Sequence, residues 1–379
     1  MKILHCCLSC FYVDNFNYQE NILPRQNKED GHDVKILAST ETFIDGELGY
    51  VSEGRYINED KIEVTRVPYK KFLPHRIMRK LRFYKNVRYN LERFKPDIIF
   101  FHGTAAGELN TISKYMKKNS GVTLYLDSHE DFNNTARTIP SKFFYKHIQG
   151  IFLKKVLKYT KKIFYISRET KEYLKEMYNI TEEKLEWYPL GGIIFEPQVY
   201  NKNREEIRES LGIGEKEILF VHSGKMDKLK RTSNILRAFT NVKDERFRLA
   251  LIGSFPDEVW EDVRKYIETD DRISYLGWKS GEELLEYLCA ADMYLQPGTQ
   301  SATLQNAMCC RCAVMIYPYS SHQDYLKGNG FFVKDEGDIE EGLKQISVNP
   351  DMLVEMQKKS EEIAEKDLDY KKLAAKIYQ

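Results

Sequence analysis

Short runs of apolar residues alternate with segments of helical spacing along most of the chain. Strand patterns in the first half lie at residues 2–8, 32–39, 95–103 and 122–130. The run at 95–103 is continuously apolar, which is typical of a strand buried on both faces of a parallel sheet. A helical pattern follows it at residues 105–119. This alternation predicts an α/β fold.

The same alternation restarts after a turn-rich stretch at residues 188–201. Its strand patterns lie at residues 217–225, 248–254, 273–278 and 292–298. A chain of 379 residues exceeds one ordinary core and suits two domains. We therefore predict two Rossmann-like domains whose parallel sheets face a central cleft. Their predicted bounds are residues 1–190 and 191–365, with a terminal helix at 366–379 that packs back on the first domain.

Polar residues follow the predicted strands of the first half. They are Ser9, His102, His129 and Ser167. In open α/β sheets ligands bind at the carboxyl ends of the strands, so these side chains are candidates for a site. His129 lies in the acidic segment 127–131 and faces the predicted cleft, which favours a functional role. A packed or hydrogen-bonded role is commoner for a lone histidine, and it is the expectation for His102 and His222.

In the second half, Lys225 and Lys230 follow a strand pattern and precede a helix. Two cations at the mouth of a cleft suit a diphosphate, whose charge grows when it departs as a leaving group. Solvated loop lysines are the alternative. The segment 297–303, PGTQSAT, favours the diphosphate, because N–H groups at the start of a helix near Ser301 attract an anion.

The motifs of the second half come in a recognisable order. A strand with a Gly-Lys-x4-Lys loop ends at Lys230, and LALIGS, ISYLGW and a Pro-Gly turn into a helix follow it. In this order they resemble the donor half of retaining glycosyltransferases of family 4, which have the GT-B fold. The segments YQENILPRQNKEDGHDV at 18–34 and DSHEDFNN at 127–134 resemble a subgroup of that family. The resemblance covers nearly the whole chain. It implies metal-independent transfer of a sugar from a nucleotide diphosphate sugar, such as a UDP-sugar, with retention of configuration.

The resemblance also implies residue roles. The catalytic residues would be His129, which orients or polarises the sugar, and Lys225 and Lys230, which stabilise the departing diphosphate. The donor would be bound by Gly224, Tyr275, Gly277, Trp278, Gly298, Thr299, Gln300, Ser301, Ala302, Thr303, Gln305 and Asn306. The acceptor would be bound by Tyr18, Gln19, Glu20 and Asn21, in a loop that lacks the family's usual glycine pair. No cofactor and no bound metal are implied.

Amides stand where the family has a glutamate that grips the ribose hydroxyls. That position falls on Gln305 or Asn306, and a second family glutamate, which touches the sugar, falls within residues 298–300. A neutral hydrogen bond contributes about 0.5–1.5 kcal/mol, against about 1.5–3 kcal/mol for a charged one. Two interpretations stay open: the donor is held differently, or the enzyme is weak.

Two basic stretches are interleaved with apolar residues. Residues 70–95 hold ten Lys or Arg and one acidic residue, and residues 142–162 hold seven Lys and no acidic residue. An apolar face beside a cationic face suits the surface of an anionic bilayer, although a core-facing helix with a solvated side is the commoner use of the pattern. Since the family often uses lipid-linked acceptors, we expect contact with an anionic membrane surface. The sequence holds no nucleic-acid-binding motif.

Composition narrows the class and the compartment. Hydrophobic residues make up 42% and charged residues 30% of the chain, which indicates a soluble globular protein. Seven cysteines, an odd number, favour reduced thiols in a cytoplasm, and their clusters at 6–10 and 309–312 lack the paired spacing of a zinc site. We expect a cytoplasmic protein that is peripheral on the inner face of the cell membrane.

Together these patterns predict a hexosyl- or N-acetylhexosaminyl-transferase that builds a lipid-linked or surface glycan in bacterial polysaccharide biosynthesis. Two alternatives stay open. One is a sugar-nucleotide epimerase of the same fold, against which the basic apolar stretches argue because its substrate is fully soluble. The other is a non-catalytic sugar-nucleotide or glycan-binding subunit, motivated by the missing glutamates.

Overall fold

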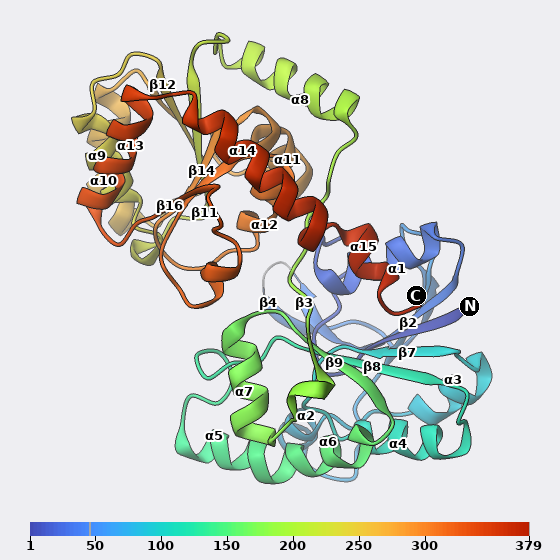
Figure 1. Ribbon diagram of the computed structural model, residues 1–379. Helices are drawn as coiled ribbons and strands as arrows, with labels where there is room; N and C mark the ends of the chain where they lie inside the picture. Colours follow the sequence, from blue (N-terminus) through green and yellow to red (C-terminus); the bar gives the residue numbers. More distant parts are fainter. Residues whose placement is uncertain (45–46, 379) are drawn as a thin grey trace. The chain divides into compact units, whose positions relative to one another are not determined.

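A computed structural model describes residues 1–44 and 47–378, which form two compact units (Figure 1). Unit 1 comprises residues 1–189 together with the C-terminal segment that begins at Tyr370, and unit 2 comprises Leu190–Asp369. The chain therefore crosses between the units twice. The terminal helix α15 (Tyr370–Ala375) belongs to unit 1.

Unit 1 is built on an eight-stranded sheet of order β10-β9-β8-β7-β1-β2-β6-β5. The strands are β1 (Lys2–Cys7), β2 (Asp33–Ser39), β5 (Gly54–Ile57), β6 (Glu63–Val67), β7 (Ile98–Phe101), β8 (Thr123–Ser128), β9 (Thr160–Tyr165) and β10 (Leu185–Trp187). All neighbours pair in parallel except β5 with β6. A separate antiparallel hairpin joins β3 (Glu41–Ile44) to β4 (Glu47–Tyr50).

Helices cover both faces of this sheet. They are α1 (Gln19–Glu29), α2 (His75–Leu81), α3 (Val87–Phe94), α4 (Leu109–Lys118), α5 (Ile139–Phe144), α6 (Gly150–Leu157) and α7 (Arg168–Tyr178). Successive residues of β1 enter opposite cores, with Leu4 in one and Ile3 in the other. The second core also contains Leu373 and Ile377 from the chain's C-terminal segment. Burying such side chains contributes about 1.5–3 kcal/mol each, which ties the end of the chain to unit 1.

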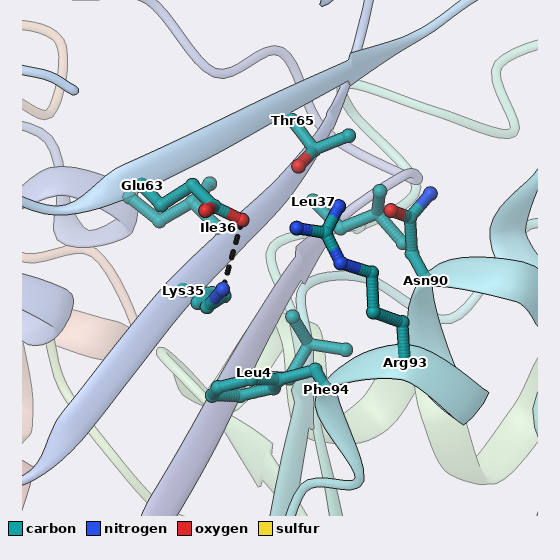
Figure 2. Close-up of a pocket in the computed structure, with 9 residues that line it drawn as sticks. All are labelled: Leu4, Lys35, Ile36, Leu37, Glu63, Thr65, Asn90, Arg93 and Phe94. Atoms are coloured by element: carbon teal, nitrogen blue, oxygen red, sulfur yellow. Dashed lines mark hydrogen bonds and ion pairs between the residues drawn. The ribbon is translucent and has the colours of Figure 1, made fainter. Parts of the chain in front are cut away.

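An ion pair supports the junction of β2, β6 and α3. Lys35 Nζ lies 2.9 Å from Glu63 Oε1, and the two residues are partners in the register of β2 and β6 (Figure 2). The same ammonium lies 5.1 Å from the centroid of the Phe94 ring at the end of α3. These side chains line a pocket of about 20 Å³, which has room for about one water molecule. The pocket is therefore a gap in the packing of α3 on the sheet and too small for a substrate.

Unit 2 repeats the architecture with a six-stranded parallel sheet of order β13-β12-β11-β14-β15-β16. Its strands are β11 (Ile218–Lys225), β12 (Phe247–Ser254), β13 (Ile273–Tyr275), β14 (Met293–Gln296), β15 (Ala313–Ile316) and β16 (Gly330–Phe332). Its helices are α8 (Pro197–Ser210), α9 (Thr232–Asn241), α10 (Asp257–Thr269), α11 (Gly281–Ala290), α12 (Thr303–Cys309), α13 (Glu336–Val348) and α14 (Met352–Ile363). Both faces are again buried, because Phe220 and Val221 of β11 enter different cores.

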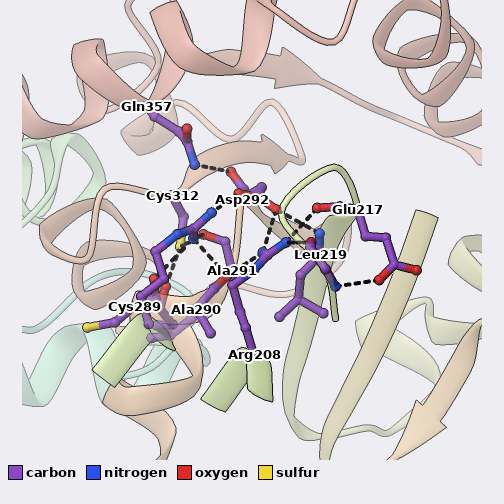
Figure 3. Close-up of polar contacts among 12 residues, drawn as sticks. Arg208, Glu217, Leu219, Cys289, Ala290, Ala291, Asp292, Cys312 and Gln357 are labelled. Carbon is purple, nitrogen blue, oxygen red and sulfur yellow. Dashed lines mark hydrogen bonds and ion pairs between the residues drawn. The ribbon is translucent and has the colours of Figure 1, made fainter. Parts of the chain in front are cut away.

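Helix α8 begins inside the stretch that the sequence suggested to be turns. Its buried residues are only Tyr200 and Arg208, so no apolar stripe marks it as a helix. Two arginines hold it in place: Arg204 and Arg208 pair with Asp292 at N–O distances of 2.6 and 3.2 Å. Asp292 also accepts a 2.8 Å hydrogen bond from the Leu219 N–H (Figure 3). The network fixes α8 to the starts of β11 and β14.

The two connections between the units are joined to each other where they leave unit 2. The Gly192 N–H donates to the Leu368 carbonyl at 2.9 Å. A Cβ on residue 192 would lie 2.7 Å from Cys309 Sγ and 2.9 Å from Asn306 Oδ1. A side chain here would therefore require Cys309 and Asn306 to shift, and the first connection lies directly on α12.

Candidate active site

The loop after β11 carries both candidate lysines. Asp227 shapes the loop, since its carboxylate accepts from the N–H groups of Leu229 and Lys230 at 2.9 and 3.2 Å. Lys225, the last residue of β11, is exposed. Gly224 before it has φ +122°, a backbone conformation that suits glycine.

The turn after β14 docks onto this loop. A Cβ on residue 298 would lie 2.1 Å from the Leu229 carbonyl oxygen, so the close approach of the two backbones requires Gly298. The Thr299 N–H donates to the same carbonyl at 3.1 Å, and Lys230 Nζ donates to the Thr299 carbonyl at 3.2 Å. The structure thus brings the lysine loop and the 297–303 segment together, as the sequence order suggested.

Lys230 is the more enclosed of the two lysines. Burial lowers its pKa, and the nearby Asp227 carboxylate only partly offsets that effect. An ammonium group has three N–H donors, and Thr299 takes one of them. A bound anion would both use the remaining donors and compensate for the burial of the charge.

The start of α12 lies slightly later than the sequence pattern suggested. The helix begins at Thr303, and the Ser301 hydroxyl accepts from the Thr303 N–H at 3.3 Å. Ala302 is exposed, and Gln300 Nε2 donates to the Ser321 hydroxyl at 2.7 Å. Because Ser301 already occupies one N–H at the start of the helix, fewer N–H groups face outward than a bare helix end would offer.

The two amides of α12 have different surroundings. Gln305 is 7% exposed, and its Oε1 accepts no hydrogen bond from any described residue. Asn306 lies against Gly192. Sequence reasoning missed a third amide, Gln296 at the end of β14, which is 1% exposed and whose two amide atoms also have no partner in the described chain. Gln305 therefore fits the ribose position better than Asn306 does, because its buried acceptor is unsatisfied.

The candidate donor-binding residues Tyr275, Gly277 and Trp278 lie at and just after the end of β13, beside the end of β12. Gly277 has φ +68°, and its carbonyl accepts from the Gly253 N–H at 2.8 Å. Tyr275 donates from its hydroxyl to the Gly253 carbonyl at 3.0 Å and packs near Trp260, with ring centroids 5.5 Å apart. Trp278 is 69% exposed. The segment thus has two exposed aromatic residues, Tyr275 and Trp278, next to β12, which is the neighbour of β11.

His222 is a structural residue. Its Nδ1 donates to the Leu295 carbonyl at 2.8 Å, and its Nε2 contacts the Thr232 hydroxyl at 2.9 Å. Burial lowers its pKa to about 4, so the ring is neutral and links β11, β14 and α9.

In unit 1, the residues after β7 and β8 form a buried polar chain. His102 Nδ1 lies 2.7 Å from Asp127 Oδ2, and His102 Nε2 lies 3.0 Å from His5 Nδ1. His5 Nε2 in turn lies 2.9 Å from Asn27 Oδ1, which can only accept. His5 therefore carries its proton on Nε2 and accepts at Nδ1, which leaves both nitrogens of His102 as donors.

The charges of this chain agree with that assignment. Burial lowers the pKa of His5 to about 3, so its ring is neutral. Burial also acts against the charge on His102, but the Asp127 carboxylate outweighs it and raises the pKa of His102 to about 9. The same pairing holds the pKa of Asp127 well below its usual range although burial opposes the charge. Asp127 also accepts from the Gly103 N–H at 2.6 Å.

His129 lies at the exposed end of this row of buried polar side chains. Its Nε2 is 3.7 Å from Asp127 Oδ2, and 34% of its side chain is exposed. Burial of the ring opposes its charge, but Asp127, Glu20 and Glu130 together raise its pKa to about 9. Sequence reasoning selected His129 and left His102 aside. In the structure the Asp127 carboxylate lies near both rings, 2.7 Å from His102 Nδ1 and 3.7 Å from His129 Nε2.

The candidate acceptor loop adjoins these groups. Glu20 acts electrostatically on both His102 and His129. Gln19 is 2% exposed, and neither of its amide atoms has a partner within the described residues. The predicted loop is wrong: Gln19, Glu20 and Asn21 form the first turn of α1, and Tyr18 directly precedes the helix. Asn21 donates to the Val13 carbonyl at 2.9 Å, and Tyr18 is 51% exposed. The structure brings this helix start to the same edge of the unit 1 sheet as His129.

Two further features bear on cofactors and membranes. No group of three His, Cys, Asp or Glu side chains with the geometry for a metal ion occurs in residues 1–44 and 47–378. Over the same residues, no helix has the length and apolar character needed to cross a bilayer.

Two family models match the chain, one in each unit. The model described as glycosyl transferases group 1 matches residues 203–366, and the model described as glycosyltransferase family 4 matches residues 23–191. No curated protein matches the chain in sequence.

Solved structures share its fold at low sequence identity. Alr3699/HepE from Anabaena in complex with UDP has a TM-score of 0.70 and 13% identity, with 100% of this chain and 98% of that chain covered. A glycosyltransferase from Rickettsia africae ESF-5 has a TM-score of 0.69 and 14% identity over 99% and 96% of the two chains. WaaG, a glycosyltransferase involved in lipopolysaccharide biosynthesis, has a TM-score of 0.63 and 15% identity over 99% of each chain. These likenesses confirm the predicted GT-B fold.

Proposed function

We propose that this chain is a group 1 glycosyltransferase and that it transfers a hexosyl or N-acetylhexosaminyl group from a nucleotide diphosphate sugar to a glycan acceptor with retention of configuration. A UDP-sugar is the first donor to test, because the similar Alr3699/HepE is described in complex with UDP. The proposed acceptor is a lipid-linked or surface glycan.

The half-buried ammonium of Lys230 carries this proposal. It is held by the Thr299 carbonyl at 3.2 Å, on a loop that Gly298 locks against the 297–303 turn. A preorganised cation of this kind stabilises a leaving diphosphate more in the transition state than in the ground state, because the negative charge grows as the sugar–phosphate bond breaks. Lys225 supplies a second positive charge at the end of β11, the strand that leads into this loop.

His129 is proposed to orient the transferred sugar. Its raised pKa of about 9 means that the ring is cationic at neutral pH, so it is a hydrogen-bond donor rather than a general base. Its Nε2 lies 3.7 Å from the Asp127 carboxylate, which also pairs with His102 at 2.7 Å. The reaction itself would need no metal and no cofactor.

The decisive experiment compares two lysines of one turn. Lys230→Met removes the enclosed ammonium, whereas Lys228→Met removes an exposed one that pairs with Glu258 at 2.9 Å. We expect Lys230→Met to lower kcat/KM for donor at least about tenfold, which corresponds to about 1.4 kcal/mol, and Lys228→Met to leave it within about twofold. Equal effects of the two variants would contradict the assignment of Lys230 to the diphosphate.

The same assay separates the alternative functions. A transferase consumes the donor in proportion to transfer when the acceptor is present. An epimerase would convert the donor sugar without an acceptor, and a binding subunit would bind the nucleotide sugar without turnover.

Unit 1 also carries a candidate membrane surface. The basic stretches form α2, α3, α5 and α6, and a short π-helix at Tyr145–Gln149 joins α5 to α6. Exposed apolar side chains stand among their lysines and arginines: Phe72, Leu73, Ile77, Ile139, Phe143, Ile148 and Ile151. We propose that this surface binds the anionic inner face of the cell membrane, which would place a cytoplasmic enzyme beside a lipid-linked acceptor.

Vesicle sedimentation tests the membrane proposal. Binding should require anionic lipid and weaken as salt rises, because each cation near such a surface contributes about 1 kcal/mol and salt screens it. Phe143→Ser should weaken binding, while Val348→Ser, at an exposed position of unit 2, should not. Equal binding to neutral and anionic vesicles would contradict the electrostatic part of the proposal.

A further inference from the structure

A cavity of about 570 Å³ lies wholly within unit 1, and neither the candidate acceptor loop at residues 18–21 nor the histidine chain lines it. One wall is cationic, with Arg76, Arg79 and Lys80 from α2 and Arg82 directly after it. The opposite wall comes from the segment before and within α5. The two basic stretches of the sequence therefore meet at one hollow.

The cavity keeps most of its positive charge. Its one acidic residue, Glu41, is 1% exposed, forms an ion pair with Arg79 and accepts from the Tyr69 hydroxyl at 2.5 Å. That pairing offsets Arg79. Neither Arg76 nor Lys80 forms an ion pair with any residue that the structure describes, and both are exposed. Three lining cations are thus left without a carboxylate partner in the cavity wall.

Aromatic rings stand beside these cations. Phe11, Phe144 and Tyr145 line the cavity together with hydroxyl groups such as Thr135. Arginine forks match the oxygens of phosphate groups, and rings provide apolar faces for a sugar. The volume lies within the range of small-molecule sites and exceeds what a single ion needs. The chemistry fits a phosphate group attached to a sugar or a lipid.

The cavity adjoins the edge of the sheet where the acceptor is proposed to bind. Arg82 donates to the Ser9 carbonyl and, at 2.8 Å, to the Ser9 hydroxyl, in the loop that also supplies Phe11. Glu130 acts electrostatically on both Arg82 and His129. An anion in the cavity would therefore lie on the same side of unit 1 as the histidine chain.

We propose that this cavity binds a phosphate or diphosphate group of the acceptor, an inference that rests on the proposed glycosyltransferase function. The group could be borne by a lipid-linked glycan or by a soluble phosphorylated one, and both present the same oxygens. Arg76, Lys80 and Arg82 would bind it, and the aromatic wall would contact the adjoining sugar.

Inorganic pyrophosphate is the probe for the first test, with the full chain and isothermal calorimetry. Pyrophosphate could also reach the donor lysines, so every variant carries Lys225→Met and Lys230→Met. In this background, Arg76→Gln with Lys80→Gln should weaken pyrophosphate binding at least about tenfold, since charged hydrogen bonds are lost. The matched control is Lys117→Gln with Lys118→Gln, which removes the same charge from exposed positions of α4. Equal affinities of the two variants would overturn the proposal.

The second test separates the sources of the phosphate. Vesicles of phosphatidylcholine with or without a prenyl diphosphate are sedimented with the Arg76/Lys80 variant and with the Lys117/Lys118 control. If only the Arg76/Lys80 variant loses binding to the vesicles with prenyl diphosphate, the phosphate is borne by a lipid. If that variant loses pyrophosphate binding but binds these vesicles as the control does, the phosphate is borne by a soluble glycan. Weaker binding to both vesicle types with unchanged pyrophosphate affinity would overturn the proposal, because the residues would then act only as a general membrane contact.

Donor turnover keeps this proposal distinct from the proposed function. Wild-type protein that turns over no nucleotide sugar but still shows the Arg76/Lys80 effect would contradict the glycosyltransferase proposal alone. Protein that turns over donor but shows no effect of the Arg76/Lys80 substitutions would contradict only the proposal that the cavity binds a phosphate group.

Discussion

The amide of Gln305 offers a sharp test of how the nucleotide is held. Its Oε1 is buried and unpaired within the described residues, and an unsatisfied buried acceptor costs about 1–3 kcal/mol. A ribose hydroxyl that donates to this oxygen would recover part of that cost. Changing Gln305 to Glu would turn the bond into a charge-assisted one, which is stronger by about 1 kcal/mol, or about fivefold in affinity.

Calorimetry with UDP measures the effect directly. We expect Gln305→Glu to tighten binding by up to about fivefold and Gln305→Ala to weaken it, because the acceptor is lost. Asn306→Asp is the matched control, since Asn306 lies against Gly192 and its substitution should leave the affinity unchanged. Repulsion between the new carboxylate and the diphosphate acts against this gain in affinity. A thermal melt of each variant should accompany the titration to show that the variant is folded. Unchanged affinity in both Gln305 variants would refute the placement of the ribose.

Three further outcomes are expected. Arg208→Met should lower the free energy of unfolding by about 3 kcal/mol in urea titration. It removes the donor to the largely buried Asp292 and to the carbonyls of Gly214 and Glu217. Lys202→Met, on the same helix, should change the free energy of unfolding little, and equal losses in the two variants would contradict this account. Asp127→Asn should lower the pKa of His129 below about 9 in NMR titration. The pKa of His129 in the folded protein lies above 6.5, and that of Asp127 lies below 3.8. The loss of unfolding free energy in Asp127→Asn should therefore be largest between about pH 4 and 6.5, and it should shrink as pH rises through about 9 and again in strong acid. A loss that is the same at every pH would contradict the pairing. Transfer should persist in EDTA, and loss of activity that magnesium or manganese restores would contradict metal independence.

The order of strands and helices could be predicted because it depends on local pattern. The polar ends of β7 and β8 follow from short segments, so the local pattern is enough to select His102 and His129 as candidates. The sequence favoured a functional role for His129, but the contact of His102 with Asp127 could not be predicted, because it depends on the pairing of β7 with β8. Helix α8 was missed for another reason: its contacts are made by arginines, which leave no apolar periodicity.

The site itself shows the same limit. The lysine loop and the 297–303 turn were each recognisable, but their contact depends on the absence of a side chain at Gly298, which no local pattern reveals. The cavity of unit 1 is formed by residues near 80 and near 140, so only the folded chain brings its cations and rings together.

The hydrogen bond between Gly192 and Leu368 has a mechanical consequence. The two connections between the units leave unit 2 at one place, so a change that displaces one segment there also breaks its bond to the other. The first of these segments lies against α12, the helix that follows the donor turn, because Gly192 packs closely on Cys309. A substitution at Gly192 would therefore disturb α12, the helix that follows the donor turn, together with both connections.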